Sequence, residues 1–240
     1  MRCKIFVLLF LLSTASIAQQ EGIYNLPRFD SRLLHFGFTI GFNQMDFTLK
    51  RTKFSEQKDS ILNISTQGQF GFQIAIVSDL KIGNNLNLRF TPGLSFGDRK
   101  VNYDISKTIY DINTPLNDTV LKVTKTSEST FLDFPLLLKF KTNRITNFRA
   151  YALLGGKYSY DLASQSKKKQ EDEEFLKLLP HDYSLEVGTG VEWYLEYFKF
   201  GVEIRMSYGF PDMLKREGTI YTNNIDRLSS KIWWLCFTFE

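Results

Sequence analysis

Apolar and polar residues alternate strictly over unusually long stretches of this sequence, and a period of two residues is typical of a β-strand with two different faces. Soluble strands average about 5–6 residues, whereas a strand that crosses a bilayer needs about 9–11. The alternating stretches are nine to thirteen residues long, so we expect membrane-crossing strands. The predicted strands are residues 35–47, 68–78, 86–97, 129–141, 148–160, 183–195, 198–210 and 231–239.

The two faces of these strands differ in chemistry. One face carries mostly Phe, Leu, Ile and Val, and Phe alone accounts for 22 of the 240 residues. The other face carries Gly, Ser, Thr and ionisable residues, which cost about 2–4 kcal/mol each when basic and placed against lipid at mid-depth. We therefore expect the apolar face to contact lipid and the polar face to fill a narrow lumen. The predicted polar network of the lumen is Arg89, Asp133, Lys139, Arg149, Lys157, Glu186, Glu192, Glu203 and Arg205, with Lys141 on the same face.

Two residues interrupt this alternation. Pro92 lacks the N–H that a strand donates to its neighbour, and Leu137 is an apolar residue on the polar face of its strand.

The connections between the predicted strands alternate between long and short. Residues 48–67, 98–128, 161–182 and 211–230 are long, and residues 79–85, 142–147 and 196–197 are short. Outer-membrane barrels combine long outer loops with tight periplasmic turns, so both ends of the barrel domain are expected on the periplasmic side. Alternation of Val101, Tyr103 and Ile105 predicts that the third and fourth strands continue beyond the membrane, and residues 166–179 are predicted to form a loop helix ended by Pro180.

A soluble, lipocalin-like barrel is the competing fold. It would place the apolar face inside and the polar face in water. The polar face here is rich in Gly and carries few charges along each strand, which favours a tight lumen over a solvated exterior. The fold class is therefore predicted as all-β, a transmembrane up-and-down antiparallel barrel of about eight strands.

The first residues have the pattern of a secretory signal peptide. Arg2 and Lys4 precede an apolar run over residues 5–12, and small residues lead to a cleavage position near Ala18. The run is too short for a spanning helix. We expect residues 1–18 to be a signal peptide, 19–34 a periplasmic segment and 35–240 the barrel. Sec export would then deliver the chain to the outer membrane of a Gram-negative bacterium.

Composition excludes several functions. The formal net charge is +4 and no basic stripe is present, so no nucleic-acid partner is expected. Of two Cys residues, Cys3 lies in the expected signal peptide and Cys236 would remain alone. Two His and one Cys, far apart in sequence, form no zinc pattern. No metal, cofactor or catalytic residue is predicted.

The last strand ends in alternating aromatic and apolar residues. These are Trp233, Leu235, Phe237 and Phe239. Such an ending resembles the signal by which the barrel-assembly machinery recognises its clients, which makes that machinery an expected partner. The usual pattern ends on an aromatic residue, whereas here Glu240 follows Phe239.

Two stretches resemble a known family. Residues 35–47, with Gly41, Asn43 and the following Met45-Asp46-Phe47, resemble the PorT family. Residues 131–140, with Pro135 and Lys139, resemble the larger outer-membrane β-barrel superfamily of Bacteroidetes to which PorT belongs. The resemblance covers about residues 35–240. It implies a non-enzymatic accessory barrel of type IX secretion, which exports proteins with C-terminal signals, including gliding components. Its implied partners are outer-membrane lipid and other outer-membrane or periplasmic proteins of that system.

Two other functions stay open. A structural or adhesive barrel would bind surfaces through its outer loops. A lipid-modifying enzyme would need a Ser activated by a base near the outer leaflet, and His181, close to Asp182 and Ser184 in sequence, is the one His expected on that side. His35 is expected at the periplasmic end. A conducting pore is disfavoured because eight strands leave no open lumen.

Overall fold

The computed structural model describes residues 24–51, 61–109, 117–164, 177–216, 222 and 224–240. Within these residues the chain is all-β apart from short turns and a 3₁₀ turn, η2 (Phe29–Ser31). The strands are β1 (Leu34–Arg51), β2 (Ile61–Lys81), β3 (Leu86–Phe90), β4 (Gly93–Ile109), β5 (Asn117–Lys141), β6 (Phe148–Asp161), β7 (His181–Tyr194), β8 (Lys199–Gly209) and β9 (Ile225–Phe239). No helix among the described residues is long and apolar enough to cross a membrane.

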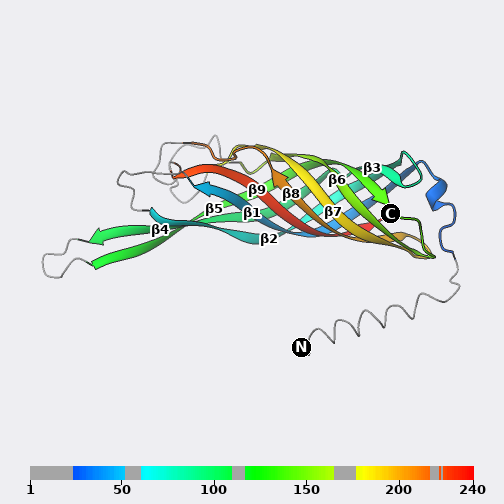
Figure 1. Ribbon diagram of the computed structural model, residues 1–240, viewed down its shortest axis with the longest axis horizontal. Helices are drawn as coiled ribbons and strands as arrows, with labels where there is room; N and C mark the ends of the chain where they lie inside the picture. Colours follow the sequence, from blue (N-terminus) through cyan, green and yellow to red (C-terminus); the bar gives the residue numbers. More distant parts are fainter. Residues whose placement is uncertain (1–23, 52–60, 110–116, 165–176, 217–221, 223) are drawn as a thin grey trace, which may run out of the picture.

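The strands close into a barrel. All pairings are antiparallel, and β1 pairs with both β2 and β9, so that Phe38 lies opposite Ile76 on one side and Phe239 on the other. Figure 1 shows the strands tilted around a common long axis. The predicted up-and-down antiparallel barrel is therefore confirmed.

One position in the barrel is shared by β3 and β4. Both pair with β2 on one side and with β5 on the other, so nine strands occupy eight positions. The break falls at Thr91 and Pro92, where the missing N–H of Pro92 interrupts the ladder. Hydrogen bonds continue around the break, since Ile76 donates to the Pro92 carbonyl at 2.9 Å and Thr91 donates to the Pro135 carbonyl at 3.3 Å.

The strands extend further at one end than the sequence pattern predicts. β2 begins at Ile61 rather than residue 68, and β5 begins at Asn117 rather than residue 129. β4 and β5 stay paired to Ile109 and Asn117, and their hairpin projects beyond the rest of the barrel at the left of Figure 1. The continuation expected from Val101, Tyr103 and Ile105 is thus observed.

The opposite end carries the short connections. Residues 82–85, 142–147 and 195–198 join neighbouring strands there, and η2 and the C-terminus lie at the same end (Figure 1). The expected signal peptide lies outside the described residues, as do residues 166–176 of the expected loop helix. Of the remaining part of that helix, Leu178 forms an isolated β-bridge with Leu214.

Side chains alternate between the two faces of each strand. Phe36, Phe70 and Ile76 point outward and are 65%, 83% and 63% exposed, whereas Thr39 and Gln73 point inward and are buried. The exterior of the barrel is thus a broad apolar surface, which is the expected pattern for contact with lipid.

Candidate functional site: the charged lumen and its mouth

Arg89 is the centre of an ion-pair network in the half of the lumen nearest the C-terminus. It points inward from β3 with 1% of its side chain exposed. Its guanidinium lies 2.8 Å from Asp79, 3.1 Å from Glu203 and 2.7 Å from Glu240. A planar guanidinium offers five donors in a fixed geometry, so one arginine can bind acids from three strands or strand ends at once.

Two lysines complete this network. Lys139 pairs with Glu192 and lies 3.2 Å from Asp79. Lys199 lies 3.1 Å from Glu192 and 2.7 Å from Glu240. The cluster thus sets three cations against the four carboxylates of Asp79, Glu192, Glu203 and Glu240, and Arg205 supplies a fourth cation through Glu203. Such pairing is what allows charges to be buried.

The position of Glu240 explains how this chain tolerates an acid after its last aromatic residue. Phe239 points outward, so the next side chain points inward, and that of Glu240 is fully buried between Arg89 and Lys199. The backbones of Glu240 and Lys199 also exchange hydrogen bonds at 2.7 and 3.0 Å. The terminal residue therefore closes both the ladder and the ion-pair network.

Arg205 links this network to the middle of the lumen. It lies 2.7 Å from Glu186 and 3.2 Å from Glu203, and it donates to the side-chain oxygen of Gln73 at 3.1 Å. Its guanidinium also lies 3.1 Å from the buried Cys236 sulfur. The lone thiol is therefore enclosed by the polar network.

A second acid–base cluster lies beyond Arg205 along the barrel axis, further from the C-terminus. Asp133 accepts hydrogen bonds from Ser95 and Ser159, each at 2.5 Å, and lies 3.5 Å from Lys157. The Lys157 ammonium lies 4.2 Å from the centre of the Trp234 ring. Cation–π contact supplements a single ion pair here.

Arg99 lies beyond Asp133 along the barrel axis, nearer to the end with the long connections. It donates to Ser129 at 2.6 Å and lies 3.6 Å from Asp161. The rings of Phe47 and Phe131 flank its guanidinium at 4.5 and 4.9 Å. Arg99 marks the transition from a polar to an apolar interior.

The outer end of the barrel is filled by apolar side chains. They come from the extended ends of the strands and from the connections before β7 and β9. The members are Phe47, Ile64, Val101, Tyr103, Leu178, Met213, Leu214, Ile225 and Leu228. We call this group the outer apolar plug, because it fills the space above the charged lumen.

The other end is covered by residues 24–33, which we call the mouth segment. Asp30 accepts two hydrogen bonds from Arg149, at 2.8 and 2.9 Å, and one from Tyr194 at 3.0 Å. Burial alone would raise the pKa of Asp30, but the hydrogen bond and charge of Arg149 outweigh it and lower the pKa overall. The side chain of Asn25 donates to the Tyr194 carbonyl at 3.0 Å. The segment is thus bound to the barrel rather than extended away from it.

The nine residues of the predicted lumen network all point inward and are at most 8% exposed. The structure distributes them over three levels: Arg89, Lys139, Glu192 and Glu203 lie together, as do Arg205 with Glu186 and Asp133 with Lys157. Arg149 lies apart at the mouth. Sequence reasoning missed Asp79, Arg99, Asp161 and Glu240, each of which lies one or two residues beyond the end of a predicted strand. It also missed Lys199, which lies inside the predicted strand 198–210 and points into the lumen. The side chains of Trp233 and Leu235 point outward, and those of Phe237 and Phe239 share that face.

The residues near His181 do not form a catalytic arrangement. His181 is exposed on the outside of β7 and its Nδ1 hydrogen-bonds the Tyr158 hydroxyl at 2.8 Å. Asp182 and Ser184 are buried, and the Ser184 hydroxyl donates to the Lys157 carbonyl at 3.5 Å. A base and a nucleophile that cooperate must lie within hydrogen-bond reach, and here they lie on different sides of the wall. Among the described residues, no group of His, Cys, Asp and Glu has the geometry of a metal site.

Comparison with known proteins identifies a family. Residues 17–215 match the model of a family described as outer membrane protein beta-barrel domain. No curated protein matches.

Several solved structures with some similarity are small outer-membrane barrels. OprG from Pseudomonas aeruginosa has 11% identity and a TM-score of 0.43, with 85% of this chain and 94% of that chain covered. Neisserial surface protein A has 11% identity and a TM-score of 0.40, with coverage of 85% and 97%. Ail of Yersinia pestis, in complex with the heparin analogue sucrose octasulfate, has 12% identity and a TM-score of 0.37, with coverage of 85% and 96%.

Proposed function

The chain belongs to the outer membrane protein beta-barrel domain family, and we propose that it is a non-enzymatic member that serves as an accessory barrel in type IX protein secretion. Membership places it in the outer membrane, in contact with lipid. The short connections and the mouth segment then face the periplasm, and the β4–β5 hairpin faces outward.

The filled interior is the observation that carries this proposal. The mouth segment, three levels of paired charges and the outer apolar plug follow one another along the barrel axis. Such an interior leaves transport to another protein and favours a role through the surfaces of the barrel. An accessory component that assembles or stabilises a larger translocon would act through such surfaces and would need no open lumen.

The resemblance to PorT supplies the process. Its first stretch forms most of β1, where Gly41 lies close to Cys236 across the β1–β9 pair. Its second stretch lies in β5, where Pro135 accepts a hydrogen bond from Thr91 and Lys139 joins the Arg89 network. These residues thus have structural roles in the β1–β9 pair, beside the break between β3 and β4, and in the lumen. We propose that other secretion-system proteins contact the apolar wall or the periplasmic end.

Deletion of the gene in its native host tests the secretion role. Surface and secreted proteins would be quantified by mass spectrometry, with the deletion strain carrying the wild-type gene as control. We expect selective loss of proteins with C-terminal signals and accumulation of their precursors in the periplasm. Normal export of that class would contradict the proposal.

A structural or adhesive barrel is the second candidate, and the projecting β4–β5 hairpin favours it. A variant that joins Ser106 to Val120, which lie opposite each other just beyond the last β2–β4 pair at Ile105, through a short turn would remove the projection and keep the outer apolar plug. Loss of surface binding with unchanged export would favour adhesion. Loss of export would favour a secretion role for the hairpin.

A further inference from the structure

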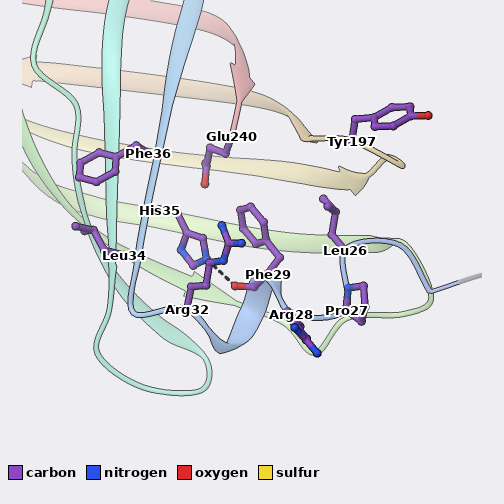
Figure 2. A pocket seen from close by; sticks show the side chains of 10 residues that line it. All are labelled: Leu26, Pro27, Arg28, Phe29, Arg32, Leu34, His35, Phe36, Tyr197 and Glu240. Atoms are coloured by element: carbon purple, nitrogen blue, oxygen red, sulfur yellow. Dashed lines mark hydrogen bonds between the residues drawn. The ribbon is translucent and has the colours of Figure 1, made fainter.

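A cavity of about 630 Å³ lies at the periplasmic mouth. It is bounded by the mouth segment, the first residues of β1, Tyr197 in the turn between β7 and β8, and Glu240 (Figure 2). Its volume is within the range of about 300–1,000 Å³ that small-ligand sites occupy.

Two arginines give this cavity a positive rim. Arg28 and Arg32 both line it and both are exposed. Within the described part of the chain, neither guanidinium has an ion-pair or hydrogen-bond partner, in contrast to Arg89 and Arg149. Figure 2 shows the two groups at separate places on the segment, Arg32 beside His35 and Arg28 beside Pro27. Each unpaired guanidinium can donate hydrogen bonds to an anionic headgroup.

Another part of the lining is apolar and continuous with the outward-facing side of β1. Leu34 and Phe36, 42% and 65% exposed, line the cavity and begin the outward stripe of β1 that continues with Phe38. Tyr197, 83% exposed, lies in the turn between β7 and β8, and exposed tyrosines near strand ends are typical of the membrane interface. The cavity therefore joins a cationic rim to a surface that contacts acyl chains.

The arginines are carried by a backbone that the barrel fixes. The rings of Phe29 and His35 stack at 4.2 Å, and the buried His35 Nε2 lies 2.7 Å from the Phe29 carbonyl oxygen. Figure 2 shows this contact as a dashed line between His35 and Phe29, and Phe29 lies between Arg28 and Arg32 in sequence. The hydrogen bonds between Asp30 and Arg149 hold the same segment. The rim is thus preorganised, which lowers the entropy cost of binding.

We propose that this cavity binds an anionic phospholipid of the inner leaflet of the outer membrane, with its headgroup at the cationic rim formed by Arg28 and Arg32 and an acyl chain along Leu34 and Phe36. Positive charge at a membrane surface attracts anionic headgroups, and the apolar wall distinguishes a lipid from a soluble anion. The assignment to the inner leaflet rests on the orientation proposed above, in which the mouth faces the periplasm, and the proposal is independent of the secretion role.

Native mass spectrometry of the purified full chain in detergent tests this proposal. Dioleoyl phosphatidylglycerol, dioleoyl phosphatidylcholine and glycerol 3-phosphate would be titrated separately. We expect retention of one phosphatidylglycerol, about tenfold weaker retention of phosphatidylcholine, and no retention of glycerol 3-phosphate. The double variant Arg28→Gln/Arg32→Gln should reduce phosphatidylglycerol retention about tenfold, and Phe36→Ala should also reduce it.

The matched control is Arg227→Gln, an exposed arginine near the outer end of β9. It removes a charge away from the cavity and should leave retention unchanged. Heat-modified gel migration would verify that every variant is folded. Equal retention by the double variant and the wild type would overturn the proposal. The proposal would also be overturned if both lipids were retained equally or if inorganic phosphate displaced the lipid. A preference for an acidic peptide over phosphatidylglycerol would overturn it as well.

Discussion

A buried arginine needs carboxylates nearby to compensate for the loss of its hydration, whereas an exposed lysine stays hydrated. Arg89 is enclosed by the acids Asp79, Glu203 and Glu240, with almost none of its side chain exposed. Lys50 and Asp226 form an ion pair at 3.0 Å near the outer end, but their side chains are 71% and 48% exposed. Water screens the second pair and not the first, so the same chemistry has different energetic weight at the two positions.

Replacement of Arg89 by Ala should destabilise the barrel strongly. The change leaves three buried carboxylates short of one cation, and breaking a buried pair in this way costs about 3–5 kcal/mol. Urea unfolding of the protein refolded into detergent would measure the free energy of unfolding. Lys50→Ala is the control and should cost at most about 1 kcal/mol. Similar losses for the two variants would contradict the assigned network.

At the scale of elements, the sequence was most informative where strands cross the membrane. Each predicted strand lies at its expected place, because the lipid and the filled lumen impose opposite polarity on alternate residues. Beyond the membrane this contrast disappears. The inward residues Phe47, Val101 and Tyr103 are apolar and join the outer plug, so the pattern that identifies the strands no longer marks their ends.

Two interruptions of the pattern have local causes. Pro92 divides one barrel position into β3 and β4 without separating the neighbouring strands. Leu137 packs inside the lumen with Tyr151 and Leu153. Contacts of the mouth segment could not be predicted, since the pairing of Asp30 with Arg149 joins residues that are 119 positions apart.

Adjacent glycines in β6 provide a test of strand spacing. A Cβ on Gly155 would lie 2.1 Å from the Leu136 carbonyl oxygen, whereas a Cβ on Gly156 would meet nothing within 4 Å. Gly155→Ala should therefore disturb the β5–β6 pairing and lower the yield of folded barrel, and Gly156→Ala should not. Heat-modified gel migration after refolding measures that yield. Equal yields of folded barrel for the two variants would contradict the close approach of Gly155 to the Leu136 carbonyl.

The mouth segment should detach when Asp30 is neutralised. Asp30→Asn removes the charge that Arg149 binds, so amide hydrogen exchange in residues 24–33 should become faster while exchange in the strands stays unchanged. Because the pKa of Asp30 is lowered in the folded state, docking is fully stabilised above the ordinary aspartate pKa. It is lost only as the pH falls through the lower folded value. Unchanged exchange in the variant would mean that other contacts hold the segment.

At the scale of the whole molecule, the barrel is filled in successive zones along its axis. The mouth segment covers the end with the short connections, paired charges fill the middle and the outer apolar plug fills the opposite end. Its outward faces are an apolar wall and a projecting hairpin (Figure 1). Functions that the molecule performs are therefore expected at these surfaces and at the mouth.

Conductance of the reconstituted barrel tests this account most directly. The wild-type chain would be inserted into planar bilayers, with insertion verified in parallel vesicles by heat-modified migration of the recovered protein. We predict no current steps above the bilayer baseline, because the interior is closed by paired charges and apolar side chains. Regular steps of uniform size would reveal a continuous aqueous path and contradict the sealed barrel on which the proposed accessory role depends.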